Sequence, residues 1–228
     1  MRKSLATALA GNSDDGSLPR DERRKRLSRA DKSRHTREAL LAAAAGVVGE
    51  YGYSNALISM ITARANVGQG TFYNYFESRQ DLFDQLLPVI GQELLEFIRK
   101  SSMSAKDEIE REELSFRAFF GFLQMRPEFY RILYEAEVFA PLAYRQHMET
   151  VAAGYVRVLK RARARGELAF SDENELEVVA HSLMGGRHYL CRRYARRDGE
   201  TVPVPEWVVN THMKLVRHGL YSASDKPR

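Results

Sequence analysis

The sequence has a single cysteine, Cys191, among its 228 residues. One thiol can form neither an internal disulfide nor a metal site built from several thiolates. No window of 20 residues is free of charge, so no membrane span is expected. The opening stretch MRKSLATALAGNS loosely imitates a signal peptide, but its apolar run is shorter than such a signal requires. These absences exclude a disulfide-rich secreted scaffold and favour a reducing, cytoplasmic setting.

Motifs of common enzymes are also missing. The sequence contains no Gly-x-Ser-x-Gly, no His-Glu-x-x-His, no phosphate-binding P-loop and no dinucleotide fingerprint. Glu177, His181 and His188 share roughly one helical face, but the two histidines would lie about 10 Å apart along a helix, too far to share one ion. We therefore expect no catalytic residue, no cofactor and no metal site.

Alternating apolar and polar residues, which would indicate strands, do not run for any useful length. Apolar residues recur instead at helical spacing, with Gly, Asn or Pro near the segment ends. Helices are predicted at about 33–51, 58–65, 68–76, 78–87, 108–125, 128–139, 140–165 and 173–197, and a last one follows TVPVPEW and reaches residue 221. Pro88 should bend or end the fourth helix, because it lacks an amide proton and clashes with the preceding turn. The fold class is predicted to be all-α.

Positive charge is concentrated near the N-terminus. The whole chain carries a net charge of +5, whereas residues 20–37 hold nine Lys or Arg against three Asp or Glu and so contribute +6. A basic arm on a near-neutral body suits phosphate binding, and a solvated, solubilising tail is the competing interpretation. We expect residues 1–32 to form a disordered basic arm, and Arg34 and Arg37 to contact DNA.

The stretch NVGQGTFYNYF, which begins at Asn66, places two glycines where a short helix starts and then adds four aromatic residues. Phe72 and Phe76 share one helical face that can enter a core. Gly70 and Asn74 lie on the opposite, nearly bare face. Together with the helix before it and a tight turn at Asn66, this stretch predicts a helix-turn-helix whose third helix fits the major groove of DNA.

The chemistry of the bare face suggests individual roles. Gly68 and Gly70 keep the leading end thin, so that backbone amides can approach a phosphate or a base edge. The Asn74 amide can pair with adenine through two hydrogen bonds. Four flanking side chains can donate to phosphates: Gln69, Thr71, Tyr73 and Tyr75.

The segment YGYSNALISMITARANVGQGTFYNYFESRQDLF resembles the N-terminal signature of TetR-family transcriptional regulators. The resemblance is close over residues 36–87 and rests on Ala44, Gly52, Tyr53, Ile61, Ala65, Val67, Gly70, Thr71, Tyr73, Phe76 and Leu82. It implies a first helix that positions the unit, a second that touches the DNA backbone and a third that reads bases. It also implies a two-fold dimer on a near-palindromic operator, an effector pocket in a larger helical body, and a dimer interface built by the last two helices.

The sequence departs from the family pattern at several positions. Ala56 and Leu57 stand where a hydroxyl residue usually contacts phosphate, and three nearby polar residues could replace it: Ser54, Asn55 and Ser59. Gly68-Gln69 replaces the common Ser-Lys. Arg79 stands where Lys is usual and can keep a contact with the DNA backbone. Residues 38–87 hold five acids and two bases, which makes the basic arm more important for following phosphates or entering the minor groove.

The C-terminal body is rich in aromatic residues. Ten side chains could line a hydrophobic effector cavity: Phe119, Phe122, Leu123, Tyr130, Tyr134, Tyr144, Met148, Tyr155, Met184 and His188. Each position also suits an ordinary core. The aromatic stretch of residues 116–159 weakly resembles the effector domains of family members that respond to fatty acyl or acyl-CoA ligands. The basic run from Arg157 to Arg165 could receive CoA phosphates or form a solvated face.

A glycine pair, Gly185-Gly186, interrupts a predicted helix, where each glycine costs roughly 1 kcal/mol relative to alanine. Close approach of a partner helix in a dimer would offset this, and an intramolecular crossing or a pocket wall is the alternative. The expected dimer interface comprises Gly185, Gly186, Trp207, Met213, Val216 and Leu220.

The sequence as a whole predicts a three-helix DNA-binding domain followed by a larger helical ligand-binding and dimerisation domain. The expected bounds are 1–32 for the arm, 33–80 for the helix-turn-helix, 81–222 for the body and 223–228 for a disordered tail. Its expected partners are a double-stranded operator, a hydrophobic effector and a second copy of the chain, with no membrane. A repressor released by its ligand fits this best. An architectural DNA-binding protein without an effector and a small-molecule sequestering protein with a vestigial head are the alternatives.

Overall fold

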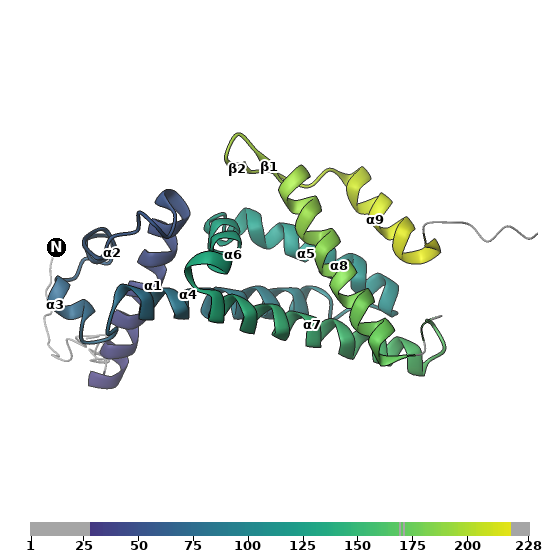
Figure 1. Ribbon diagram of the computed structural model, residues 1–228, viewed down its shortest axis with the longest axis horizontal. Helices are drawn as coiled ribbons and strands as arrows, with labels where there is room; N and C mark the ends of the chain where they lie inside the picture. Colours follow the sequence, from purple (N-terminus) through teal and green to yellow (C-terminus); the bar gives the residue numbers. More distant parts are fainter. Residues whose placement is uncertain (1–27, 169, 171, 220–228) are drawn as a thin grey trace, which may run out of the picture. The chain divides into compact units, whose positions relative to one another are not determined.

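The computed structural model describes residues 28–168, 170 and 172–219. The described residues are mainly helical, with one short hairpin as their strand content, which confirms the all-α fold class (Figure 1). The chain divides after Thr36 into two compact units, residues 1–36 and 37–228. Most of the predicted basic arm and the C-terminal tail lie outside the described residues.

Four helices form the N-terminal half of the described chain: α1 (Arg29–Tyr51), α2 (Ile58–Arg64), α3 (Gln69–Phe72) and α4 (Arg79–Ser101). The C-terminal half contains α5 (Glu108–Met125), α6 (Glu128–Phe139), α7 (Pro141–Ala164), α8 (Glu173–Tyr194) and α9 (Glu206–His218). A short antiparallel hairpin, β1 (Arg196–Arg197) with β2 (Glu200–Thr201), separates α8 from α9. None of the helices in the described part of the chain is long and apolar enough to cross a membrane.

The first helix begins at Arg29, earlier than the predicted residue 33. The Ser28 hydroxyl accepts a hydrogen bond from the Asp31 amide at 3.1 Å, and the Asp31 carboxylate accepts one from the Ser28 amide at 3.3 Å. This reciprocal cap satisfies two amides that would otherwise lack partners at the helix start. The expectation that residues 28–32 belong to a disordered arm is therefore wrong.

Pro88 does not end the fourth helix, because α4 continues to Ser101. The helix starts at the predicted cap, where the Ser78 hydroxyl accepts a hydrogen bond from the Asp81 amide at 3.1 Å. Buried apolar residues continue on both sides of the proline, including Leu87 and Ile90. Burial of this continuous face stabilises the helix across a position that local propensity disfavours.

Helix α8 ends at Tyr194, so the prediction that it continues to residue 197 is wrong. Asp198 and Gly199 both have positive φ, 52° and 85°, which is the conformation required at the centre of a tight two-residue hairpin turn. The Asp-Gly pair therefore turns a hairpin and does not simply terminate a helix.

The body is held together by an aromatic core. Helix α4 packs against α5 and α7, α7 packs against α8, and α5 packs against α9 (Figure 1). Phe116, Phe120 and Phe129 are almost completely buried in the middle of these helices. Gly91 brings α4 close to α7, since a Cβ at this position would lie 2.4 Å from His147 Nδ1.

Candidate DNA-binding and effector-binding sites

The turn between α2 and α3 forms as predicted around Asn66, whose φ is 53°. Helix α3 is only one turn long, shorter than the predicted 68–76. Hydrogen-bonded turns continue after it to Phe76. The Phe76 amide donates to the Phe72 carbonyl at 3.1 Å, and both phenylalanine side chains are buried with ring centroids 5.5 Å apart. The two rings therefore anchor the segment to the core as expected.

The opposite face of α3 is open. Gly68 and Gly70 are exposed, and no atom of the described residues lies within 4 Å of a Cβ built at either position. Gln69 and Asn74 are exposed, and Tyr73 is 58% exposed. Two further predicted contacts, Thr71 and Tyr75, are half-buried. Packing among the described residues does not require either glycine, so this end of α3 is accessible to another molecule.

Two arginines predicted to contact DNA also donate hydrogen bonds to other residues of the chain. Arg37 donates to the Gln85 side chain and lies over the Phe76 ring. Arg79 donates to the Ala56 carbonyl at 3.4 Å. Each guanidinium has five N–H donors, so these contacts leave donors for a phosphate.

The other two predicted contacts in this part of the chain are exposed. Arg34 lies on α1 and pairs with Asp31 at 2.8 Å. Ser59 lies on α2. Sequence reasoning placed both on surfaces, and both remain predictions as DNA contacts.

A junction that sequence reasoning missed joins the end of α1 to α6. Arg131 donates to the Glu50 carbonyl at 2.8 Å, and Glu135 accepts from the Tyr53 amide at 2.9 Å. Gly49 allows close packing here, because a Cβ would lie 2.4 Å from the Glu128 Cβ. Helix α6 thus satisfies backbone groups at the C-terminus of α1 that the helix itself cannot pair.

Five of the ten predicted effector residues line one small cavity of about 60 Å³ between α4, α5, α6, α7 and α8. These five are Phe119, Met148, Tyr155, Met184 and His188. A volume of this size holds about two water molecules or one small chemical group. The cavity also includes two polar side chains that the sequence did not single out, His147 and Arg187.

The remaining predicted effector residues are elsewhere. Phe122 and Leu123 are buried in the aromatic core and do not line the small cavity. Tyr130 and Tyr134 stack on each other with ring centroids 4.2 Å apart, and the Tyr134 hydroxyl donates to the His188 carbonyl at 2.8 Å. For these four the core interpretation fits the observed packing.

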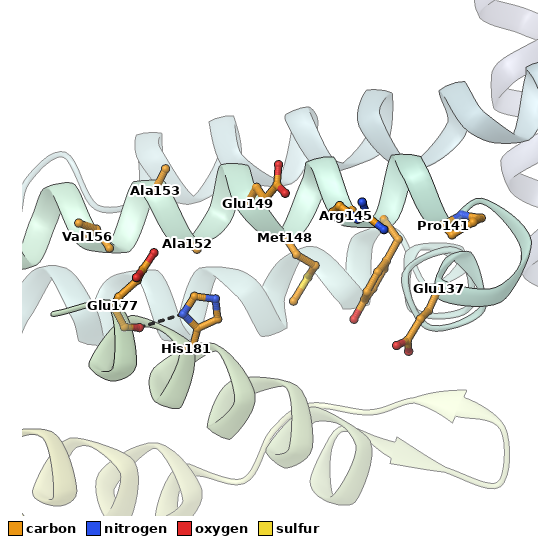
Figure 2. Close-up of a pocket in the computed structure, with 11 residues that line it drawn as sticks. Glu137, Pro141, Arg145, Met148, Glu149, Ala152, Ala153, Val156, Glu177 and His181 are labelled. Atoms are coloured by element: carbon orange, nitrogen blue, oxygen red, sulfur yellow. Dashed lines mark hydrogen bonds between the residues drawn. The ribbon is translucent and has the colours of Figure 1, made fainter. Parts of the chain in front are cut away.

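A larger groove of about 740 Å³ lies between α7 and α8, and Tyr144 and Met148 line it. Figure 2 shows Met148 pointing from α7 toward the side on which His181 rises from α8. Apolar groups of Ala152 and Val156 also line the groove. Met148 lines both spaces, so the groove and the small cavity adjoin at its side chain.

Arg187 is the centre of a buried polar cluster. It is 7% exposed and donates to Glu112 at 2.8 Å, and the same carboxylate oxygen lies 3.3 Å from His212 Nε2. Burial raises the pKa of the Glu112 carboxyl, but the charge of Arg187 and the contact with His212 outweigh this and hold the pKa below its usual value. Glu112 is therefore ionised and balances the Arg187 charge.

Two buried donors next to this cluster have no partner among the described residues: Arg187 Nε and the Tyr155 hydroxyl. The Arg187 guanidinium carbon lies 5.4 Å from the centre of the Tyr155 ring. Buried polar groups in folded proteins are nearly always hydrogen-bonded, so two such donors at one cavity require an explanation.

The predicted dimer-interface residues have different surroundings. Gly185 and Gly186 would meet no atom of the described chain with an added Cβ, which argues against the intramolecular crossing. Trp207 is 56% exposed. Met213 is 5% exposed and packs inside its own chain, so it belongs to the core, and the prediction that it lies in an interface is wrong. Val216 is half-buried, and Leu220 lies outside the described residues.

The basic run on α7 is largely paired with carboxylates. Lys160 and Arg163 contact Glu173 at 2.5 and 3.2 Å. Arg161 and Arg165 contact Glu108 at 3.5 and 3.1 Å. These pairs favour the interpretation of the run as a solvated face.

Residues 40–86 match the family model described as bacterial regulatory proteins, tetR family. The N-terminal domain is therefore similar to the helix-turn-helix of TetR-family regulators. Among curated proteins, the HTH-type transcriptional activator FasR from Mycolicibacterium smegmatis is 30% identical over 134 residues, which cover 59% of this chain and 55% of that protein. The uncharacterised HTH-type transcriptional regulator YhgD from Bacillus subtilis is 28% identical over 90 residues, 40% of this chain and 46% of that protein. The chain thus matches about half the length of these curated relatives.

Solved structures of transcriptional regulators share the fold over more than three quarters of the chain. The transcriptional regulator FadR from Bacillus subtilis, solved in complex with stearoyl-CoA, has a TM-score of 0.65 at 16% identity and covers 81% of this chain and 99% of that one. A putative TetR-family regulator from Syntrophomonas wolfei has a TM-score of 0.69 at 20% identity, over 84% and 99% of the two chains. At these identities the likeness establishes the fold.

Proposed function

We propose that the chain is a cytoplasmic, dimeric repressor of the TetR type that leaves a palindromic operator when a hydrophobic, acyl-bearing molecule binds its body. The observation that carries the DNA-binding part is the open end of α3, where a Cβ added at Gly68 or Gly70 would meet no atom of the described residues. Phe72 and Phe76 hold this end against the core while its outer face stays exposed. A glycine-lined helix start suits close approach to the DNA backbone.

Two features support the proposed response to a ligand. The body contains a cavity with an adjoining groove, and helix α6 holds the C-terminal end of α1. A ligand shifts the equilibrium between two conformations by no more than its difference in affinity for them. Helix α4, which follows the helix-turn-helix and packs on α7 at Gly91, is the element we propose to carry the change.

The test is selection of bound sequences from a random DNA library at physiological salt. We expect one enriched palindromic motif, since a two-fold dimer presents two identical reading heads. The variant Gly70→Leu should abolish enrichment at unchanged thermal stability, because its side chain projects into open space. Gly121→Ala is the control, at a glycine of α5 where an added Cβ would also meet no atom of the described residues. Salt-sensitive binding without enrichment would instead support the architectural alternative.

A further inference from the structure

Two donors at the small cavity have no acceptor partner among the described residues. Arg187 Nε and the Tyr155 hydroxyl are buried without partners among the described residues, and both side chains line this cavity. Leaving a buried donor unpaired is unfavourable, so an occupant of the cavity that supplies an oxygen acceptor gains free energy that an apolar occupant does not. The cavity therefore selects for an acceptor.

The positive charge at the cavity is already balanced by a neighbouring carboxylate. Arg187 contributes one positive charge, and Glu112, 2.8 Å away, contributes one negative charge. A carboxylate entering this site would lose its hydration without meeting an unpaired cation, which is strongly unfavourable. A carbonyl oxygen needs only the two hydrogen bonds and carries no net charge. The cluster therefore favours an uncharged acceptor over an anion.

The adjoining groove has a similar preference. Three carboxylates line it, from Glu137, Glu149 and Glu177, against the single guanidinium of Arg145. An excess of negative charge around a groove disfavours polyanions. Apolar groups of Met148, Ala152 and Val156 offer contacts to a hydrocarbon chain.

We propose that the body binds an uncharged acyl ester or amide, with its carbonyl oxygen accepting hydrogen bonds from Arg187 Nε and the Tyr155 hydroxyl and its hydrocarbon part lying in the α7–α8 groove beyond Met148. This proposal rests on the effector-binding part of the proposed function and narrows the class of effector. Met148 lines both spaces and must move aside as the carbonyl enters.

Direct binding without DNA tests the proposal. Calorimetric titration with methyl decanoate, decanoate and decanoyl-CoA compares one chain length with three head groups. We expect the methyl ester to bind at least tenfold more tightly than the acid or the CoA thioester. Preference for decanoate or decanoyl-CoA would overturn the proposal, and so would the absence of saturable methyl decanoate binding up to its solubility limit.

The variant Tyr155→Phe separates a ligand role from a structural one. It should weaken methyl decanoate binding by about three- to tenfold, the value of one net hydrogen bond. It should not lower the melting temperature of the free protein, because the hydroxyl has no hydrogen-bond partner to lose among the described residues. An unchanged affinity would contradict the proposal. Arg187→Met is less informative, since it would leave the buried Glu112 carboxylate unpaired.

Tyr134→Phe is the matched control. Its hydroxyl donates to the His188 carbonyl and lines neither the cavity nor the groove, so ester affinity should stay unchanged. Failure of this proposal is distinct from failure of the proposed function. An enriched operator together with a preference for decanoyl-CoA would retain the regulator and reject the uncharged effector.

Discussion

The Asn74 side chain is an exposed amide on the outer face of the segment 69–76. If it pairs with adenine, Asn74→Ala should weaken binding to the selected operator by roughly 1–3 kcal/mol and leave non-specific binding unchanged. Titration of labelled operator and scrambled DNA at one salt concentration measures both. The exposed Asn210 of α9 provides the control, because Asn210→Ala removes the same group far along the chain. Equal losses on both DNAs would contradict a base-reading role.

His147 is 7% exposed, and burial lowers its pKa to about 4. The unfolded chain takes up a proton near the ordinary pKa of about 6.5, whereas the folded chain resists it until about pH 4. The contribution of this residue to stability is therefore complete above about pH 6.5 and is lost as the pH falls toward 4.

At pH 5 this residue alone should make the protein about 2 kcal/mol less stable than at pH 7. Urea unfolding of the wild type and of His147→Gln at both pH values checks this, with the difference between the two proteins isolating the imidazole. Identical pH dependence of the two proteins would show that His147 is not held neutral.

At the scale of elements, the junction between α1 and α6 decides how the helix-turn-helix is held. Gly49→Ala would place a Cβ 2.4 Å from the Glu128 Cβ and 2.9 Å from its Cα, so the two helices must separate. We expect a loss of about 1–3 kcal/mol in stability, as for other overpacked sites, and a weaker response of operator binding to ligand.

Gly46→Ala is the matched control on the same helix. Its Cβ would meet only the tip of the Arg64 side chain at 2.5 Å, and this flexible group can swing aside at the loss of its ion pair with Glu50. Exposed pairs of this kind contribute little, so the stability change should stay below about 1 kcal/mol. Equal effects in thermal unfolding of the two variants would show that the junction is not tightly packed.

At the scale of the whole molecule, the outer faces of α8 and α9 expose several large apolar side chains: Val178, Tyr189, Trp207 and Leu215. Gly185 lies among them on α8 with open space above it. Such a face needs cover, and a second copy of the chain supplies it in the proposed dimer.

Tyr189→Asp should therefore convert the dimer to a monomer in sedimentation experiments at about micromolar concentration, since a buried charge opposes association. Operator affinity should fall with it, because each reading head then binds its half-site separately. Val138→Asp is the control, as Val138 is 74% exposed on α6, outside this face. A dimeric Tyr189→Asp protein would place the interface elsewhere.

Most helices could be predicted from local patterns, because apolar spacing and end signals act within a few residues. Asn66 takes the left-handed conformation expected of it, and Ser78 caps α4. The errors have local causes too. Ser28 and Asp31 form a helix cap, and Asp198 and Gly199 form a hairpin turn, and both are local sequence signals. Pro88, in contrast, stays helical because of burial that no local pattern reveals.

The sequence by itself determined the helix-turn-helix, since close spacing places Phe72 and Phe76 inward and Gly70 and Asn74 outward. The polar cluster of the body was decided only by tertiary structure. Glu112, Arg187 and His212 are far apart along the chain, and only the packing of α5, α8 and α9 brings them together. Whether an arginine is exposed or buried beside an unpartnered tyrosine depends on contacts between helices, and residue spacing within one helix carries no information about those contacts.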